Sequence, residues 1–127
     1  MSIDERITVQ RIEHVAVVVS DVDRAKAFYG AVLGLTEVPR PESFDFAGAW
    51  YRNGPTDLHI ITRPQADAQS RRHVAFYVAD LDVAARVLKA HGHPVLPEEK
   101  YKIKNIDRFF TADPDGNRIE IMGPERK

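Results

Sequence analysis

The sequence predicts an α+β fold built of two tandem β-α-β-β-β modules, and three observations support this prediction. A stretch that begins at His14 is repeated 59 positions later, beginning at His73, with seven identical residues in twelve. Each copy starts with an apolar run that suits a strand and continues with helical spacing that ends at a glycine. Turn-rich residues then separate short apolar segments typical of hairpins. An internal repeat of this kind indicates two copies of one supersecondary unit.

The first module is expected to span residues 11–64. It begins with a strand over 12–19 and a helix over 24–33, which Ser20 caps and Gly34 ends. A short strand over 35–38 follows, and the two prolines after it interrupt the sheet because proline cannot donate to a β-ladder. Strands over 44–52 and 57–63 then flank an Asn-Gly-Pro-Thr turn.

The second module is expected to span residues 71–123, after a polar linker over 64–70. We expect a strand over 73–78, a helix over 80–90, a short strand over 94–96, and strands over 107–112 and 117–122 around an Asp-Pro-Asp-Gly turn. The charged segment 98–104 is either a solvated loop or a lid over a site. The two modules together make residues 1–127 a single domain, because each half alone would bury little surface.

Composition limits the possible partners. The net charge is −1 with both signs scattered, which does not favour nucleic-acid binding. There is no cysteine, so disulfides and thiolate metal sites are excluded, while histidines and carboxylates leave an N/O metal site open. The polar N-terminal residues and the absence of an apolar run near the ~20 residues that span a bilayer predict a cytoplasmic protein without membrane contact.

Four polar residues occupy strand positions that suit metal ligands. Alternate side chains of a strand face opposite sides of the sheet. His14 and His73 therefore lie on the face opposite the apolar residues against which the helix of each module is expected to pack. The closing strands of the two modules each offer one polar residue between apolar neighbours, His59 and Glu120. Any one of the four could be a hydrogen-bonded structural residue. As a set, three imidazoles and one carboxylate suit one divalent ion such as Zn, Ni, Fe, Mn or Co.

The paired modules, the repeated His-Val-Ala, Phe28-Tyr29 before Leu33-Gly34-Leu35, and the segment 113–120 resemble the vicinal oxygen chelate superfamily. Its members include glyoxalase I, fosfomycin-resistance enzymes, extradiol dioxygenases, methylmalonyl-CoA epimerase and metal-free bleomycin-resistance proteins. The resemblance covers residues 12–122 and implies a U-shaped mixed sheet around a central divalent metal. By position it implies the metal ligands His14, His73 and Glu120, with His59 where glyoxalase I carries a carboxylate. It also implies a homodimer, with each site formed either within one chain or from halves of two subunits.

Several reactions fit this resemblance. A metal-dependent isomerase or lyase resembling lactoylglutathione lyase would act on a small oxygenated substrate with Glu120 as catalytic base. His59 in place of a carboxylate removes one possible base of a glyoxalase I. Val18, where bacterial glyoxalase I carries an arginine that helps hold glutathione, argues against glutathione as cosubstrate. The same ligands would form the two-His, one-carboxylate triad of an iron-dependent extradiol dioxygenase. The third alternative is a metal-free resistance protein that binds a small molecule or antibiotic.

Two further groups of residues have either a binding or a structural interpretation. The aromatic residues around the third strand would line an apolar pocket or belong to the core, and these are Phe44, Phe46, Trp50 and Tyr51. The cations Arg63, Lys104 and Arg108 would hold an anionic group or lie as ordinary surface charges.

Overall fold

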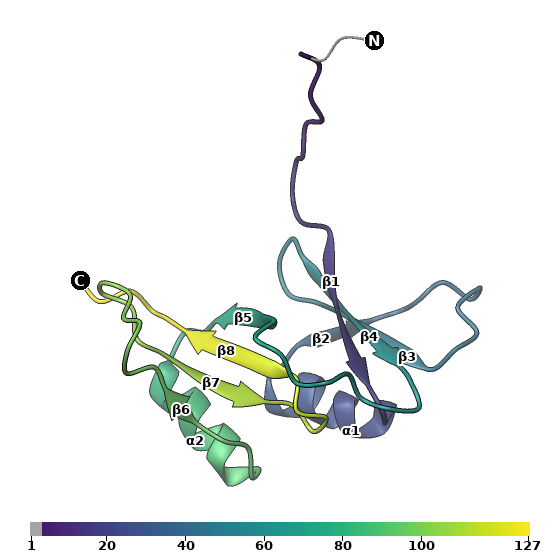
Figure 1. Ribbon diagram of the computed structural model, residues 1–127. Helices are drawn as coiled ribbons and strands as arrows, with labels where there is room; N and C mark the ends of the chain where they lie inside the picture. Colours follow the sequence, from purple (N-terminus) through teal and green to yellow (C-terminus); the bar gives the residue numbers. More distant parts are fainter. Residues whose placement is uncertain (1–3) are drawn as a thin grey trace.

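The computed structural model describes residues 4–127 and contains the two predicted modules side by side (Figure 1). Each module forms its own four-stranded mixed sheet, so the α+β fold class and the repeated β-α-β-β-β order are confirmed. Residues 1–3 of the predicted domain lie outside the described residues. No helix within residues 4–127 is long and apolar enough to cross a membrane.

The first sheet has the strand order β1-β4-β3-β2. Its strands are β1 (His14–Val19), β2 (Thr36–Val38), β3 (Gly48–Arg52) and β4 (Asp57–Thr62). β1 runs parallel to β4, whereas β3 is antiparallel to both of its neighbours. The second sheet repeats this arrangement in the order β5-β8-β7-β6. Its strands are β5 (His73–Tyr77), β6 (Leu96–Pro97), β7 (Arg108–Ala112) and β8 (Arg118–Met122).

The cap of the first helix lies one residue later than expected, and the helix begins at Val22, before the predicted start at residue 24. Asp21, not Ser20, caps α1 (Val22–Lys26), because the Asp21 carboxylate accepts a hydrogen bond from the N–H of Arg24 at 2.9 Å. The helix continues as a π-helix, η1 (Ala27–Val32), in which the N–H of Leu33 donates to the carbonyl of Phe28 at 2.9 Å. The second helix, α2 (Leu81–Ala90), is a regular α-helix capped by an aspartate at the equivalent position.

The π-helix accommodates one residue that the second copy lacks. The first strands and the helix caps of the two copies are 59 positions apart, whereas the closing glycines Gly34 and Gly92 are 58 apart. In each copy the N–H of the residue after the glycine donates to the carbonyl of a buried residue in the helix. The acceptor is Tyr29 at 3.0 Å in the first copy and Leu88 at 2.9 Å in the second. Both helices therefore end in the same way, although the first contains an extra residue.

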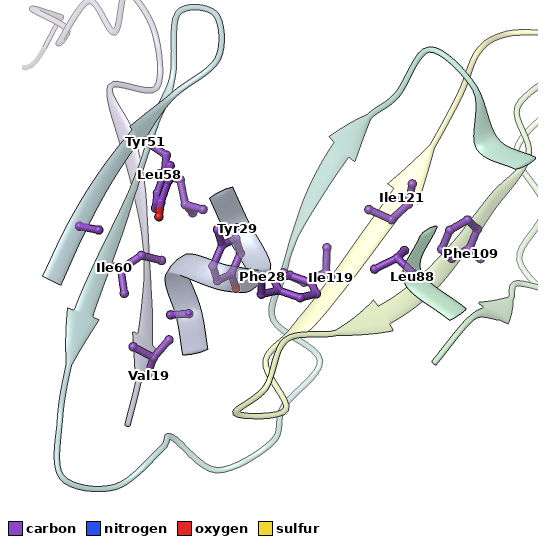
Figure 2. Packing of buried hydrophobic residues seen from close by; sticks show 12 residues of the cluster. Val19, Phe28, Tyr29, Tyr51, Leu58, Ile60, Leu88, Phe109, Ile119 and Ile121 are labelled. Carbon is purple, nitrogen blue, oxygen red and sulfur yellow. The ribbon is translucent and has the colours of Figure 1, made fainter. Parts of the chain in front are cut away.

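Two aromatic residues of η1 join the modules. Phe28 and Tyr29 lie between the two sheets, with the ring of Phe28 beside Ile119 of β8 (Figure 2). The Tyr29 hydroxyl donates to Oδ2 of Asp113 at 2.6 Å, and burial together with the Asp113 carboxylate raises the pKa of Tyr29 above its usual range. Nδ2 of Asn117 donates to the carbonyl of Val18 at 2.8 Å. The turn over residues 113–117, predicted only as a turn, thus fixes the second module to the end of β1.

The strand predicted over 44–52 begins only at Gly48. The guanidinium of Arg40 binds the carbonyls of Phe44 and Phe46, which a β-ladder would otherwise use, so residues 44–47 form a loop. Tyr51 is 2% exposed and packs in the core, on the face of β3 opposite Trp50.

Candidate metal centre

The four predicted ligands lie in equivalent places in the two modules. His14 and His59 lie on the paired strands β1 and β4, and His73 and Glu120 lie on the paired strands β5 and β8. His59 pairs in register with Ala16, and Glu120 pairs in register with Ala75. Because each alanine lies two residues after a histidine of the same strand face, each module brings its two candidate ligands to one face of its sheet.

The first half-site consists of Glu13, His14 and His59. The two imidazoles are stacked, with ring centroids 4.1 Å apart. Nδ1 of His14 lies 2.8 Å from Oε1 of Glu13, which fixes the ring and leaves Nε2 for another partner. Nε2 of His59 is buried and has no hydrogen-bond partner among the described residues. A buried nitrogen without a partner costs free energy, and a metal ion would satisfy it.

The electrostatics of the first half-site favour a neutral His59. Burial, followed by the neighbouring His14, lowers the pKa of His59 below its usual value. Oδ2 of Asp57 lies 3.7 Å from Nε2 of His59, beyond hydrogen-bond distance. The Asp57 carboxylate is held instead by Arg52, whose Nε and Nη2 donate to it at 2.8 and 3.0 Å. This hydrogen-bonded pair lowers the pKa of Asp57 and keeps its charge directed to Arg52. A neutral imidazole is the form that binds a metal ion.

The second half-site consists of His73, Glu120 and Arg108. Nδ1 of His73 donates to the carbonyl of Arg71 at 2.9 Å, and Nε2 lies 2.9 Å from Oε1 of Glu120. Nη1 of Arg108 donates to the other oxygen of Glu120 at 3.2 Å. The side chain of Glu120 is only 8% exposed, and the guanidinium of Arg108 compensates its charge within the fold. This arrangement presents one imidazole nitrogen and one carboxylate oxygen side by side.

Glu13 and Arg108 were not identified as parts of the site from the sequence. Glu13 is an exposed carboxylate next to a histidine in an extended segment, and such a neighbour carries no distinctive pattern. The sequence predicts Arg108 either to hold an anionic group or to lie as a surface charge, and the anion it holds is the chain's own Glu120. Lys104 is exposed in the segment 98–107, which forms a loop rather than a strand. In both half-sites a hydrogen bond from Nδ1 orients the histidine, as is common around metal ligands.

The chain does not bring its four predicted ligands together. Within residues 4–127, the group of three or more acidic or histidine side chains with all ligand atoms within 4.8 Å is Glu13, His14 and His59. His73 and Glu120 lie in the other sheet. β1 and β5 are terminal strands of their sheets, and a cleft of 670 Å³ separates them, with residues 67–70 of the linker along it. Each chain therefore holds the four candidate ligands as two separate pairs, one in each sheet.

Comparison with known proteins identifies the family. Residues 11–121 match the model of the Glyoxalase/Bleomycin resistance protein/Dioxygenase superfamily. The chain belongs to this superfamily. The glyoxalase family protein of Bacillus anthracis is 34% identical to it, and the two structures agree with a TM-score of 0.82 over 93% of this chain and 98% of that one.

Curated relatives within the superfamily have different names. Glyoxylase I 4 of Arabidopsis thaliana is 30% identical over 120 residues, which cover 87% of this chain and 68% of that protein. The metallothiol transferase FosB of Lysinibacillus sphaericus is 32% identical over 128 residues, which cover 91% of this chain and 83% of that protein. Superfamily members thus resemble this chain at similar levels while carrying different activities in their names.

Proposed function

We propose that this protein is a metal-dependent enzyme of the isomerase or lyase type, acting on a small molecule that offers two neighbouring oxygens. The observation that carries the proposal is the buried Nε2 of His59, which makes no hydrogen bond within the described residues, has its carboxylate neighbour Asp57 at 3.7 Å, and belongs to a ring stacked on the imidazole of His14. A purely structural histidine at this position would be expected to have a hydrogen-bond partner. The glyoxylase I relative supports an isomerase or lyase over a ring-cleaving enzyme.

In this proposal His14, His59, His73 and Glu120 hold one divalent ion, which is Zn, Ni, Fe, Mn or Co. The ion would supply Lewis-acid stabilisation of negative charge on the substrate oxygens. Glu120 would accept a proton from the substrate, since Oε1 is the carboxylate oxygen that faces His73. Arg108 would hold Oε2 and keep the carboxylate in this orientation. Glu13 and the carbonyl of Arg71 would hold the two histidine rings.

We further propose that each complete site forms between two copies of the chain. The contacts of Tyr29 and Asn117 fix the two modules in an arrangement that separates the half-sites of one chain. The outer edges of β1 and β5 have no strand partner within residues 4–127. A second copy that places its β5 beside β1 would pair these edges and bring the partner subunit's His73 and Glu120 to His14 and His59.

A complementation experiment tests the shared site without knowledge of the substrate. His59→Gln removes a ligand from the first half-site and His73→Gln from the second. Each homodimeric variant should retain little metal after dialysis. A heterodimer of the two variants, purified through two different affinity tags, contains one site with both lesions and one intact site. It should therefore hold about one metal ion, against about two in the unaltered dimer.

The result that would contradict the shared site is equally direct. If all four ligands come from one chain, the heterodimer will hold no more metal than either homodimer. A monomer in sedimentation that binds metal as tightly as the dimer would lead to the same conclusion. Failure of the unaltered protein to bind Zn or Ni at micromolar concentration would overturn the enzyme proposal and leave the metal-free binding protein.

The reaction itself requires substrate assays. Consumption of oxygen with a catechol, lost in His73→Ala, would identify an extradiol dioxygenase. Conversion of a hemithioacetal by metal-loaded protein would support the isomerase or lyase. Transfer of a thiol, suggested by the name of the FosB relative, would be a third outcome.

A further inference from the structure

Three aromatic side chains continue the row of rings that begins at the first half-site. Trp50 stacks on His59 with ring centroids 4.0 Å apart and an interplanar angle of 3°. Phe44 meets Trp50 edge to face at 5.3 Å, and the ring of Phe46 lies 5.7 Å from that of Phe44. We call Trp50, Phe44 and Phe46 the aromatic wall. Phe44 and Phe46 remain 38% and 46% exposed.

Arg40 holds the aromatic wall in place. Its Nη2 donates to the carbonyl of Phe46 at 2.5 Å, and its guanidinium carbon lies 5.2 Å from the centre of the Phe46 ring. The guanidinium fits here because Gly48 has no side chain, and a Cβ at this position would lie 2.7 Å from Nη1 of Arg40. Arg40 therefore fixes the backbone of the segment that carries the two exposed phenylalanines.

The location of the wall indicates what it binds. The wall adjoins His59, so a molecule held at the metal centre by two oxygens would extend its remaining part along these rings. A ligand that covers exposed apolar rings gains binding free energy, because it removes apolar surface from water. Aromatic rings pack well against one another edge to face or with an offset stack. We propose that the substrate carries an aromatic ring next to its two chelating oxygens and that the aromatic wall binds this ring. This inference rests on the metal centre proposed above.

Two hydroxamates test the inference, because they share one chelating group and differ in the ring. Acetohydroxamate and benzohydroxamate are titrated into the Zn-loaded dimer, and the affinities are measured by calorimetry and by the fluorescence of Trp50, the only tryptophan in the chain. Benzohydroxamate should bind about tenfold more tightly. The ratio should fall to about one in the double variant Phe44→Ala with Phe46→Ala, while the affinity for acetohydroxamate stays the same. Val83→Ala, at an exposed apolar position on α2, is the matched control and should keep the full ratio.

The possible failures are distinguishable. Equal affinity for both hydroxamates in the unaltered protein would overturn the aromatic substrate while the metal centre stands. Cyclohexanecarbohydroxamate binding as tightly as benzohydroxamate would show that the wall selects apolar groups in general and would overturn the aromatic class. A double variant that becomes monomeric in sedimentation would assign the wall to the subunit interface instead. If neither hydroxamate binds because the protein holds no metal, the proposed function fails, and this inference fails with it.

Discussion

The imidazole of His14 lies face to face with that of His59, with ring centroids 4.1 Å apart and an interplanar angle of 16°. Trp50 stacks on the other side of His59. The fluorescence of Trp50, the only tryptophan in the chain, should therefore respond to changes at the candidate ligand His59.

Binding of Ni²⁺ should quench the fluorescence of Trp50, because a metal ion on His59 would lie close to a ring that stacks on this residue. The quenching should saturate with the metal content of the protein and disappear in His59→Gln. His91→Gln, which changes an exposed histidine at the end of α2, should behave like the unaltered protein. Identical quenching in both variants would mean that the ion binds elsewhere.

Glu13→Gln should weaken metal binding by about tenfold, the lower end of the loss typical when a partner that orients a metal ligand is changed. The carboxylate lies 2.8 Å from Nδ1 of His14, and an amide would hold this nitrogen less strongly. Competition with a coloured chelator measures the affinity. Glu99→Gln is the control, since Glu99 is exposed and pairs only with Lys102 in the described contacts. An unchanged affinity in Glu13→Gln would show that His14 needs no such support.

Arg108→Met should destabilise the metal-free protein by about 2 kcal/mol, because it leaves the buried carboxylate of Glu120 without its cation. Urea unfolding measures the change, provided that the dependence on urea stays constant. Arg108→Lys keeps the charge and should lose less. Added Zn should restore part of the stability of Arg108→Met, since the ion would itself compensate Glu120. Equal stability of Arg108→Met and the unaltered protein would contradict this role.

Tyr29→Phe should change how stability depends on alkaline pH. The pKa of Tyr29 is raised in the folded protein, so the folded state keeps its proton where the unfolded chain, with a pKa of about 10, loses it. The stabilisation is complete below about pH 10 and is lost as the pH rises above it. Tyr29→Phe should be about 1 kcal/mol less stable at pH 8, and this difference should shrink toward pH 11.

Urea unfolding at several pH values provides the measurement. Tyr101→Phe is the matched control, because Tyr101 is 59% exposed and should leave the pH dependence as it was. A constant difference between Tyr29→Phe and the unaltered protein from pH 8 to about pH 11 would show that the phenol ionises alike in both states.

The repeat in the sequence predicted the modules because both depend on local patterns. Alternation along the strands also placed His59 on the same sheet face as His14, since the strand period leaves few alternatives. That the two modules hold their ligands apart could not be predicted, because the separation depends on contacts between distant residues such as Tyr29 and Asp113. Ser20 does not cap the first helix as expected for the same kind of reason, because its hydroxyl donates to Asp115 of the other module.

The loop over residues 44–47 shows a second limit of local patterns. The aromatic residues Phe44 and Phe46 alternate as they would in a strand, and this alternation predicted one. Arg40 overrides it by binding the backbone carbonyls of this segment. An arginine that acts on a loop through space leaves no periodic signal in the sequence.

The extra residue in η1 separates the length of the helix from the placement of the strands around it. Each residue added to an α-helix rotates everything after it by about 100°. Such a rotation would turn Leu33 and Leu35 away from the core that they pack against. By widening one turn, η1 holds the extra residue without this rotation, and the helix still ends at Gly34. The wider turn therefore lets the first module carry one more helical residue than the second, while β1 and β4 keep the places that bring His14 beside His59.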